Sequence, residues 1–202
     1  MRRFGPIVLG LTGSIGMGKS ETARMFRRER VPVFDADAAV HQLMAKGGAA
    51  VAVIAAAFPG VVQDGAVDRV ALGAQVFRDP LALRRLEAIL HPRVRGMEMQ
   101  FRHRAAMRRL PLVVIDVPLL FETGGEDRCD YVAVVSAPAY IQRARVLQRP
   151  GMTAERFAHV LSQQIPDQEK RHRADFIIET GLGKHRALMT VRRIIRSLTK
   201  GV

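Results

Sequence analysis

The stretch "GSIGMGKS" (Gly13–Ser20) places three glycines, a lysine and a serine at the spacing G-x-x-x-x-G-K-S. Glycines allow the backbone to curl and aim several N–H groups at one oxyanion, while the lysine reaches the β- and γ-phosphates and the hydroxyl can ligate magnesium. An apolar run precedes the loop and a helical pattern opens at Lys19, so the helix N-terminus faces the same anion. These features predict a nucleoside-triphosphate site. Its candidate residues are Gly13, Ser14, Ile15, Gly16, Met17, Gly18, Lys19, Ser20 and Glu21.

Two aspartates, Asp35 and Asp37, stand where a second apolar run, Val31–Asp35, gives way to a helical pattern. Ligands gather at the carboxyl ends of parallel strands, and this is such an end. Near a triphosphate, one of the two carboxylates can accept the proton of an attacking hydroxyl. Helix capping is the competing role, because aspartate is favoured immediately before a helix. We expect one of the pair to cap and at least one to act in catalysis.

A third carboxylate, Asp116, ends the apolar core of Leu112–Pro118. At the carboxyl end of a strand it is placed to accept magnesium-bound water, the role of a Walker-B acid. The alternative is a buried strand-end aspartate whose oxygens are satisfied by backbone N–H groups. Ser20 and Asp116 are therefore the candidate Mg²⁺ residues, and Mg²⁺ with ATP is the expected cofactor.

The elements that must position these residues alternate between apolar runs and helical patterns. Such alternation is typical of an α/β fold, in which helices cover both faces of a parallel sheet. The predicted strands are Pro6–Thr12, Val31–Asp35, Leu112–Pro118, Tyr131–Ser136 and Asp175–Glu179. The predicted helices outside the long middle segment are Lys19–Arg28, Pro138–Arg149, Thr153–Gln164 and His185–Leu198.

About seventy residues separate the second strand from the third, far more than a crossover helix of a dozen residues needs. The segment is mostly helical in pattern, with expected breaks at Gly47–Gly48, Pro59–Gly65, Pro80 and Pro92. We expect a helical subdomain over residues 37–110, inserted beside a nucleotide-binding core of residues 1–36, 111–147 and 174–202. Such an insert would form a second wall for a substrate cleft.

Composition narrows the functional class without deciding it. The net charge of +13 keeps a nucleic-acid-stimulated ATPase open, but arginines are scattered along the chain and aromatic residues are few. The chain contains no asparagine, which excludes the N-K-x-D guanine signature of GTPases. No apolar run reaches transmembrane length, and a single cysteine, Cys129, fits a reducing cytoplasm. A small P-loop domain with inserted helices favours a kinase that phosphorylates a small acceptor. A nucleoside monophosphate and a metabolite such as shikimate remain possible acceptors at this point.

Four motifs in series resemble the dephospho-CoA kinase family. They are "GLTGSIGMGKS", "DAD" after the second strand, "LGAQVFRDPLALRRLEAILHPRV" (Leu72–Val94) and "DVPLLFE". The stretches "QRARVLQRPGMTAERFAHVLSQQ" (Gln142–Gln164) and "QEKRHRADFIIETG" (Gln168–Gly181) continue the resemblance over nearly the whole chain. Members of this family transfer the γ-phosphoryl group of ATP to the 3′-hydroxyl of dephospho-CoA, the last step of coenzyme A synthesis.

The resemblance implies roles for individual residues. Asp37 would be the general base, with Asp35 the weaker candidate, and Lys19 would stabilise the migrating phosphoryl group. The insert would bind the acceptor, with His91, Leu120, Phe121 and Glu122 lining its cleft. The alternative for His91, which precedes Pro92, is an ordinary histidine at a helix end. Arg145 and Arg149 are four apart and so share one face of a helix, and the resemblance places them at a lid over ATP whose segment is residues 148–173. The alternative for this pair is a solvated basic face. It also implies ATP and dephospho-CoA as substrates. From the whole sequence we expect a cytoplasmic monomer with no nucleic-acid or membrane partner.

Two positions depart from the family pattern. The family usually has R-D-G where this chain has "RPG" (Arg149–Gly151), and Pro150 removes a backbone donor and fixes φ. Where the family often has D-N at the last strand, this chain has Glu179 and Thr180. We expect these changes to alter details of the lid and of the adenine contacts rather than the reaction.

Overall fold

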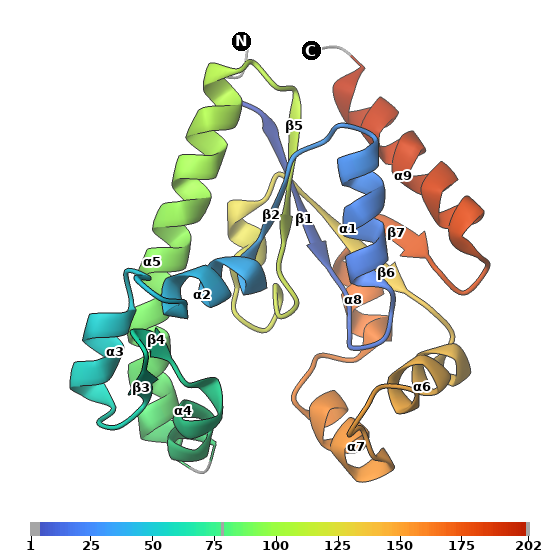
Figure 1. Ribbon diagram of the computed structural model, residues 1–202. Helices are drawn as coiled ribbons and strands as arrows, with labels where there is room; N and C mark the ends of the chain where they lie inside the picture. Colours follow the sequence, from blue (N-terminus) through green and yellow to red (C-terminus); the bar gives the residue numbers. More distant parts are fainter. Residues whose placement is uncertain (1–4, 78, 201–202) are drawn as a thin grey trace. The chain divides into compact units, whose positions relative to one another are not determined.

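The structure, a computed structural model, describes residues 5–77 and 79–200 (Figure 1). The described chain divides into two units. One consists of the residues up to Phe34 together with those from Arg102 onward, and the other is Asp35–Phe101. Arg78, part of the "VFRDP" motif, lies outside the described residues.

A five-stranded sheet with the order β2-β5-β1-β6-β7 confirms the α/β fold predicted from the alternating pattern. The central strand β1 (Ile7–Thr12) pairs in parallel with β5 (Leu112–Asp116) and β6 (Tyr131–Ser136), and β6 pairs in parallel with β7 (Phe176–Glu179). The short strand β2 (Val33–Asp35) is the neighbour of β5. Leu11 stands opposite Asp116 in the register, so the end of β1 and Asp116 share one edge of the sheet.

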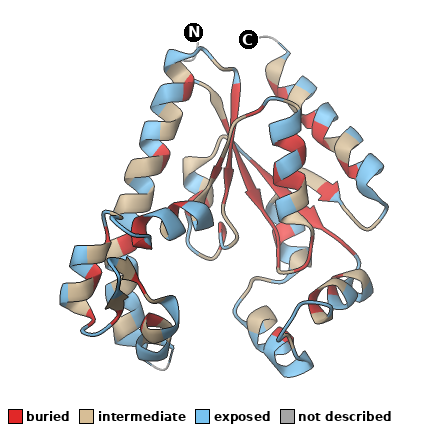
Figure 2. Ribbon diagram, viewed as in Figure 1, coloured by how far each residue is buried: buried red, intermediate tan, exposed pale blue. Residues whose placement is uncertain are grey.

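The three central strands β5, β1 and β6 are mostly buried (Figure 2). Each face of the sheet is covered by apolar side chains, and alternate residues of a strand point to opposite faces. On one face Ala133 and Val135 join a core formed with α1 (Lys19–Arg28) and α9 (Lys184–Thr199), which pack against each other. Val132 and Val134 point the other way and pack with Leu120, Phe121 and partly buried Cys129.

Four further helical elements of the first unit come after β5 in the chain. A short 3₁₀ helix (Gly125–Arg128) lies between these strands, and α6 (Ala139–Leu147) and α7 (Ala154–Ser162) follow β6. The seven-residue helix α8 (Asp167–Arg173) packs against β6. Sequence patterns did not predict α8, because it is highly charged and too short to show a helical period.

The unit Asp35–Phe101 has its own apolar core. Its helices are α2 (Ala36–Met44), α3 (Val51–Ala57), α4 (Arg69–Val76) and the first part of α5 (Pro80–Met107). The core includes Leu43, Ile54 and Phe58, which are contributed by α2 and by α3 and its C-cap.

Two features of this unit differ from the expected pattern. A β-hairpin, formed by β3 (Val62–Gln63) and β4 (Ala66–Val67), begins within the break expected over Pro59–Gly65. Its turn residues Asp64 and Gly65 have φ of 51° and 80°, the Asp-Gly signature of a type I′ turn. The break expected at Pro92 is wrong, because α5 continues through it. The adjacent Arg93 side chain donates to the Ile89 carbonyl at 2.7 Å, one turn earlier.

Candidate active site

The loop Gly13–Gly18 connects β1 to α1, as the motif requires. Gly16 and Gly18 have φ of 78° and 97°, which only glycine adopts without strain. A Cβ on Gly16 would also stand 2.5 Å from Cγ2 of Val146. Gly18 caps α1, whose first amides have no partner within the helix. The loop therefore presents backbone donors at a helix N-terminus, as a phosphate site needs.

Two side chains from outside the motif brace the loop at Gly16 and Met17. The Thr180 hydroxyl donates to the Met17 carbonyl at 2.5 Å. Arg145 donates to the Gly16 carbonyl at 3.4 Å, and to the Thr180 hydroxyl and carbonyl at 2.9 Å each. These contacts hold two loop carbonyls from outside.

A second brace acts on the peptide groups of Ile15. Its N–H donates to Oε1 of Gln164 at 3.1 Å, and its carbonyl accepts from Nε2 of Gln142 at 2.8 Å. Met17 is anchored in the core by its side chain, whose sulfur accepts from the Ala137 N–H at 3.1 Å. Ser14 is buried beside these residues. The conformation of the loop is thus fixed by side chains that lie more than a hundred residues later.

Lys19, the lysine of the motif, is the first residue of α1 after the loop and forms an ion pair. Its Nζ lies 2.5 Å from Oδ1 of Asp116 at the end of β5. Asp116 is only 3% exposed and Lys19 15% exposed, so the pair is largely shielded from water. The lysine predicted to bind phosphate and the aspartate predicted to serve magnesium therefore lie together.

The donor set fits magnesium, which prefers hydroxyl and carboxylate oxygens and usually keeps several waters. Ser20 is exposed in the first turn of α1, and Asp116 provides a carboxylate at the adjoining strand end. Within residues 5–77 and 79–200, no group of three or more His, Cys, Asp or Glu is placed so that it could hold a metal ion. Glu21 contacts Arg24 at 3.1 Å and Lys184 at 3.9 Å, so its charge is balanced by surface cations.

The two aspartates of "DAD" lie in the second unit and differ in their surroundings. Asp35 is the N-cap of α2, and its Oδ1 accepts from the Ala38 N–H at 2.9 Å. Asp37 is exposed in the first turn of α2, and no described residue hydrogen-bonds to its carboxylate. The capping role expected for one of the pair belongs to Asp35.

The expectation that Arg145 and Arg149 share one helix face is wrong. Helix α6 ends at Leu147, and Arg149 lies beyond its C-cap in the exposed turn that contains Pro150. The residue before a proline is biased away from helical backbone, which explains the early end. Arg145 braces the phosphate loop, whereas Arg149 is exposed.

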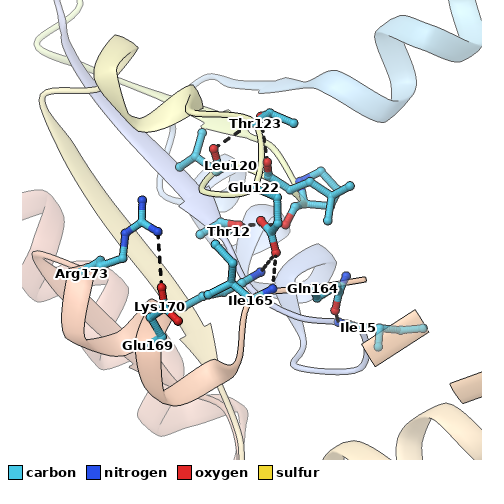
Figure 3. A network of polar contacts seen from close by, with 12 residues as sticks. Thr12, Ile15, Leu120, Glu122, Thr123, Gln164, Ile165, Glu169, Lys170 and Arg173 are labelled. Atoms are coloured by element: carbon cyan, nitrogen blue, oxygen red, sulfur yellow. Dashed lines mark hydrogen bonds and ion pairs between the residues drawn. The ribbon is translucent and has the colours of Figure 1, made fainter. Parts of the chain in front are cut away.

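The residues expected to line the acceptor cleft differ in exposure. His91 is exposed on α5. Leu120 is completely buried and Phe121 nearly so, both in the core beneath the sheet. Glu122 forms an ion pair with Lys170 at 2.7 Å and accepts from the Ile165 N–H at 3.0 Å (Figure 3).

Sequence reasoning missed three residues that hold the phosphate loop. Gln142 and Gln164 were not singled out, and Thr180 was noted only as a departure from a family pattern. No local signal identifies them, because their partners lie 127, 149 and 163 residues away.

No helix within the described ranges is long and apolar enough to cross a membrane.

The sequence model of the dephospho-CoA kinase family matches residues 7–183. A dephospho-CoA kinase from Paramagnetospirillum magneticum is 68% identical over 166 residues, covering 81% of this chain and 77% of the relative. A dephospho-CoA kinase from Mesorhizobium japonicum is 57% identical over 194 residues, covering 95% and 96%.

Solved structures agree on the fold. A Thermus thermophilus protein of known crystal structure superposes with a TM-score of 0.83 at 36% identity, over 96% of this chain and 97% of that one. Dephospho-CoA kinase from Campylobacter jejuni has a TM-score of 0.66 at 23% identity, covering 96% and 98%. The second likeness is evidence of fold alone.

Proposed function

The chain belongs to the dephospho-CoA kinase family, and we propose that its phosphate loop, Asp37 and Asp116 carry out that family's reaction. The reaction is the last step of coenzyme A synthesis. The 3′-hydroxyl oxygen of dephospho-CoA forms a bond to the γ-phosphorus of ATP, and the bond from that phosphorus to the β–γ bridging oxygen breaks. The products are coenzyme A and ADP.

Asp37 is proposed as the base that accepts the proton of the 3′-hydroxyl. Its carboxylate is exposed and has no hydrogen-bonding partner among the described residues, which leaves both oxygens available. Asp35 is the weaker candidate because one of its oxygens caps α2. A positioned carboxylate of this kind contributes about a hundred- to ten-thousandfold to rate.

Lys19 is proposed to stabilise the negative charge on the transferred phosphoryl group, because fixed cations are most effective where charge develops. The shielded contact with Asp116 supports this role, since it orients the ammonium group at the loop's mouth. Ser20 and Asp116 would hold magnesium, Asp116 partly through water. The metal, when bound, would neutralise charge on the β- and γ-phosphates.

The remaining assignments concern the lid and the acceptor. Arg149 is proposed to contact phosphate oxygens when the segment of residues 148–173 covers ATP, and its exposure leaves the guanidinium available. His91 is proposed to contact the acceptor, being exposed on the unit Asp35–Phe101.

The braced loop with Lys19 paired to Asp116 is the observation that most supports the proposed chemistry. The test is acceptor-dependent ADP release from ATP and Mg²⁺, comparing dephospho-CoA with AMP, shikimate, DNA and no acceptor. We expect turnover with dephospho-CoA alone. Release stimulated by DNA, or by another acceptor only, would contradict the proposal.

We further propose that the enzyme acts as a cytoplasmic monomer and without nucleic acid, despite its net charge of +13. The basic charge is spread along the chain rather than gathered in a tail, which supports this view. Light scattering of the purified protein tests the oligomeric state. A salt-sensitive complex with DNA at physiological ionic strength would contradict the second part.

A further inference from the structure

Helix α8 carries a buried lysine, Lys170, that is not among the proposed catalytic groups. Its side chain is 0% exposed, although lysine is almost never fully buried without a partner. Its partner is Glu122, whose Oε1 lies 2.7 Å from Nζ and whose side chain is 13% exposed. A buried ion pair often stabilises a protein no more than apolar packing of similar volume would, so stability alone does not account for this pair.

The same carboxylate oxygen leads toward the phosphate loop. Oε1 of Glu122 also accepts from the Ile165 N–H at 3.0 Å. The preceding residue, Gln164, accepts from the Ile15 N–H at 3.1 Å. Figure 3 shows Glu122 between Lys170 and Ile165, with Gln164 beside Ile165 and next to Ile15.

Further contacts fix α8 against the loop that follows β5. Arg173 forms an ion pair with Glu126 and lies 4.4 Å above the ring centre of Phe121. Ile165 packs in the core with Leu120 and Phe121. Several contacts therefore hold the segment that follows Gln164. Among them, Glu122 of the buried pair accepts directly from the backbone N–H of Ile165.

We propose that Glu122 and Lys170 are positioning residues that act on the phosphate loop through Gln164. The lysine holds the carboxylate, the carboxylate holds the Ile165 N–H, and this backbone anchor sets the Gln164 amide against Ile15. The Ile15 peptide is also held by Gln142 on its carbonyl side, so its orientation depends on both amides. The inference rests on the loop being the ATP site.

Substitution of Gln164 tests the last step. Gln164→Met keeps the length of the side chain and removes the acceptor for Ile15. Gln163→Met is the matched control, because Gln163 is the exposed neighbour on the same segment. We expect the Kd for ATP to rise about five- to tenfold in Gln164→Met, as for loss of one hydrogen bond, and to stay unchanged in the control. The KM for dephospho-CoA should be unchanged in both.

A double-mutant cycle tests whether Lys170 acts through Gln164. Lys170→Met should weaken ATP binding in the wild-type background but add nothing in the Gln164→Met background, because the two changes break one chain of contacts. Thermal unfolding of each variant confirms that the compared proteins are folded. If Lys170→Met fails to fold, Glu122→Gln takes its place in the same cycle, because it removes the charge that Lys170 holds.

Two results would overturn the inference. One is ATP binding by Gln164→Met that equals that of Gln163→Met. The other is a Lys170→Met effect on ATP binding that is the same in both backgrounds, or is absent from both, which would mean that the pair does not act on ATP binding through Gln164. Turnover of dephospho-CoA by the wild-type protein is measured separately, so failure of the proposed function would be recognised on its own.

Discussion

Lys19 Nζ and Asp116 Oδ1 lie 2.5 Å apart, joining the phosphate loop to the carboxyl end of β5. The two residues are 97 positions apart in the chain and meet because β1 and β5 are parallel neighbours, with Leu11 opposite Asp116. The lysine predicted to bind phosphate and the aspartate predicted to serve magnesium are thus in direct contact. This contact means that each charge depends on the other for its orientation.

Replacing Lys19 with methionine should lower kcat by about a thousandfold, because a fixed charge at the transferring phosphoryl group is lost. It should also lower the free energy of unfolding by about 1–3 kcal/mol, since Asp116 is nearly enclosed and loses its ion-pair partner. Steady-state kinetics and urea denaturation measure the two effects. Lys184→Met, at an 81% exposed lysine, is the control and should change neither. Turnover near the wild-type rate would contradict the assignment of Lys19.

The two aspartates should respond differently to the same isosteric change. Asp37→Asn should lower kcat about a hundred- to ten-thousandfold and leave the Kd for ATP and the stability unchanged, because only the proton acceptor is lost. Asp35→Asn should keep most activity, since asparagine caps a helix as well as aspartate. Calorimetric ATP titration and single-turnover kinetics distinguish the variants. The reverse pattern of kcat values would exchange the two roles.

Thr180→Val should lower kcat/KM for ATP about tenfold, because the Met17 carbonyl loses its hydroxyl donor and Arg145 loses an acceptor. Thr180→Ser should restore most of this loss, since it keeps the hydroxyl. The kinetics are measured with ATP varied at saturating dephospho-CoA. Thr190→Val is the control, because the Thr190 hydroxyl donates to the Arg186 carbonyl of its own helix α9. Full activity of Thr180→Val would show that the loop does not need this brace.

Gly16→Ala should lower the free energy of unfolding by about 1–3 kcal/mol and abolish detectable ATP binding. The position combines a φ of 78° with a Cβ only 2.5 Å from Val146 Cγ2. Gly73→Ala is the contrasting control: Gly73 is helical with nothing within 4 Å of the added Cβ. That change should stabilise the protein by about 0.5–1 kcal/mol. Thermal unfolding of both variants, with and without ATP, checks the pair.

Local signals were enough to predict the sheet and the loop. The five strands coincide with apolar runs of the sequence. The phosphate loop between β1 and α1 could be predicted because its glycine spacing and the adjacent helix signal involve only neighbouring residues. The capping of α2 by one of two aspartates was likewise predictable from position. What sequence could not decide there was which of the two caps.

The rest could not be predicted because it depends on long-range packing. Thr180 and Gln164 reach the loop from distant segments, and nothing near them in sequence marks that contact. Pro92 was misjudged as a break because a proline lowers helix propensity locally, while the surrounding packing keeps α5 continuous. The hairpin at Asp64–Gly65 was missed although its dipeptide was a usable signal.

The most direct test of the central claim is phosphorus NMR of the product formed from ATP, Mg²⁺ and dephospho-CoA. The account predicts a 3′-phosphomonoester that grows one-for-one with ADP in the wild-type protein and is lost in Asp37→Asn. Inorganic phosphate in place of the monoester, or a phosphoryl group at another position of the acceptor, would contradict it.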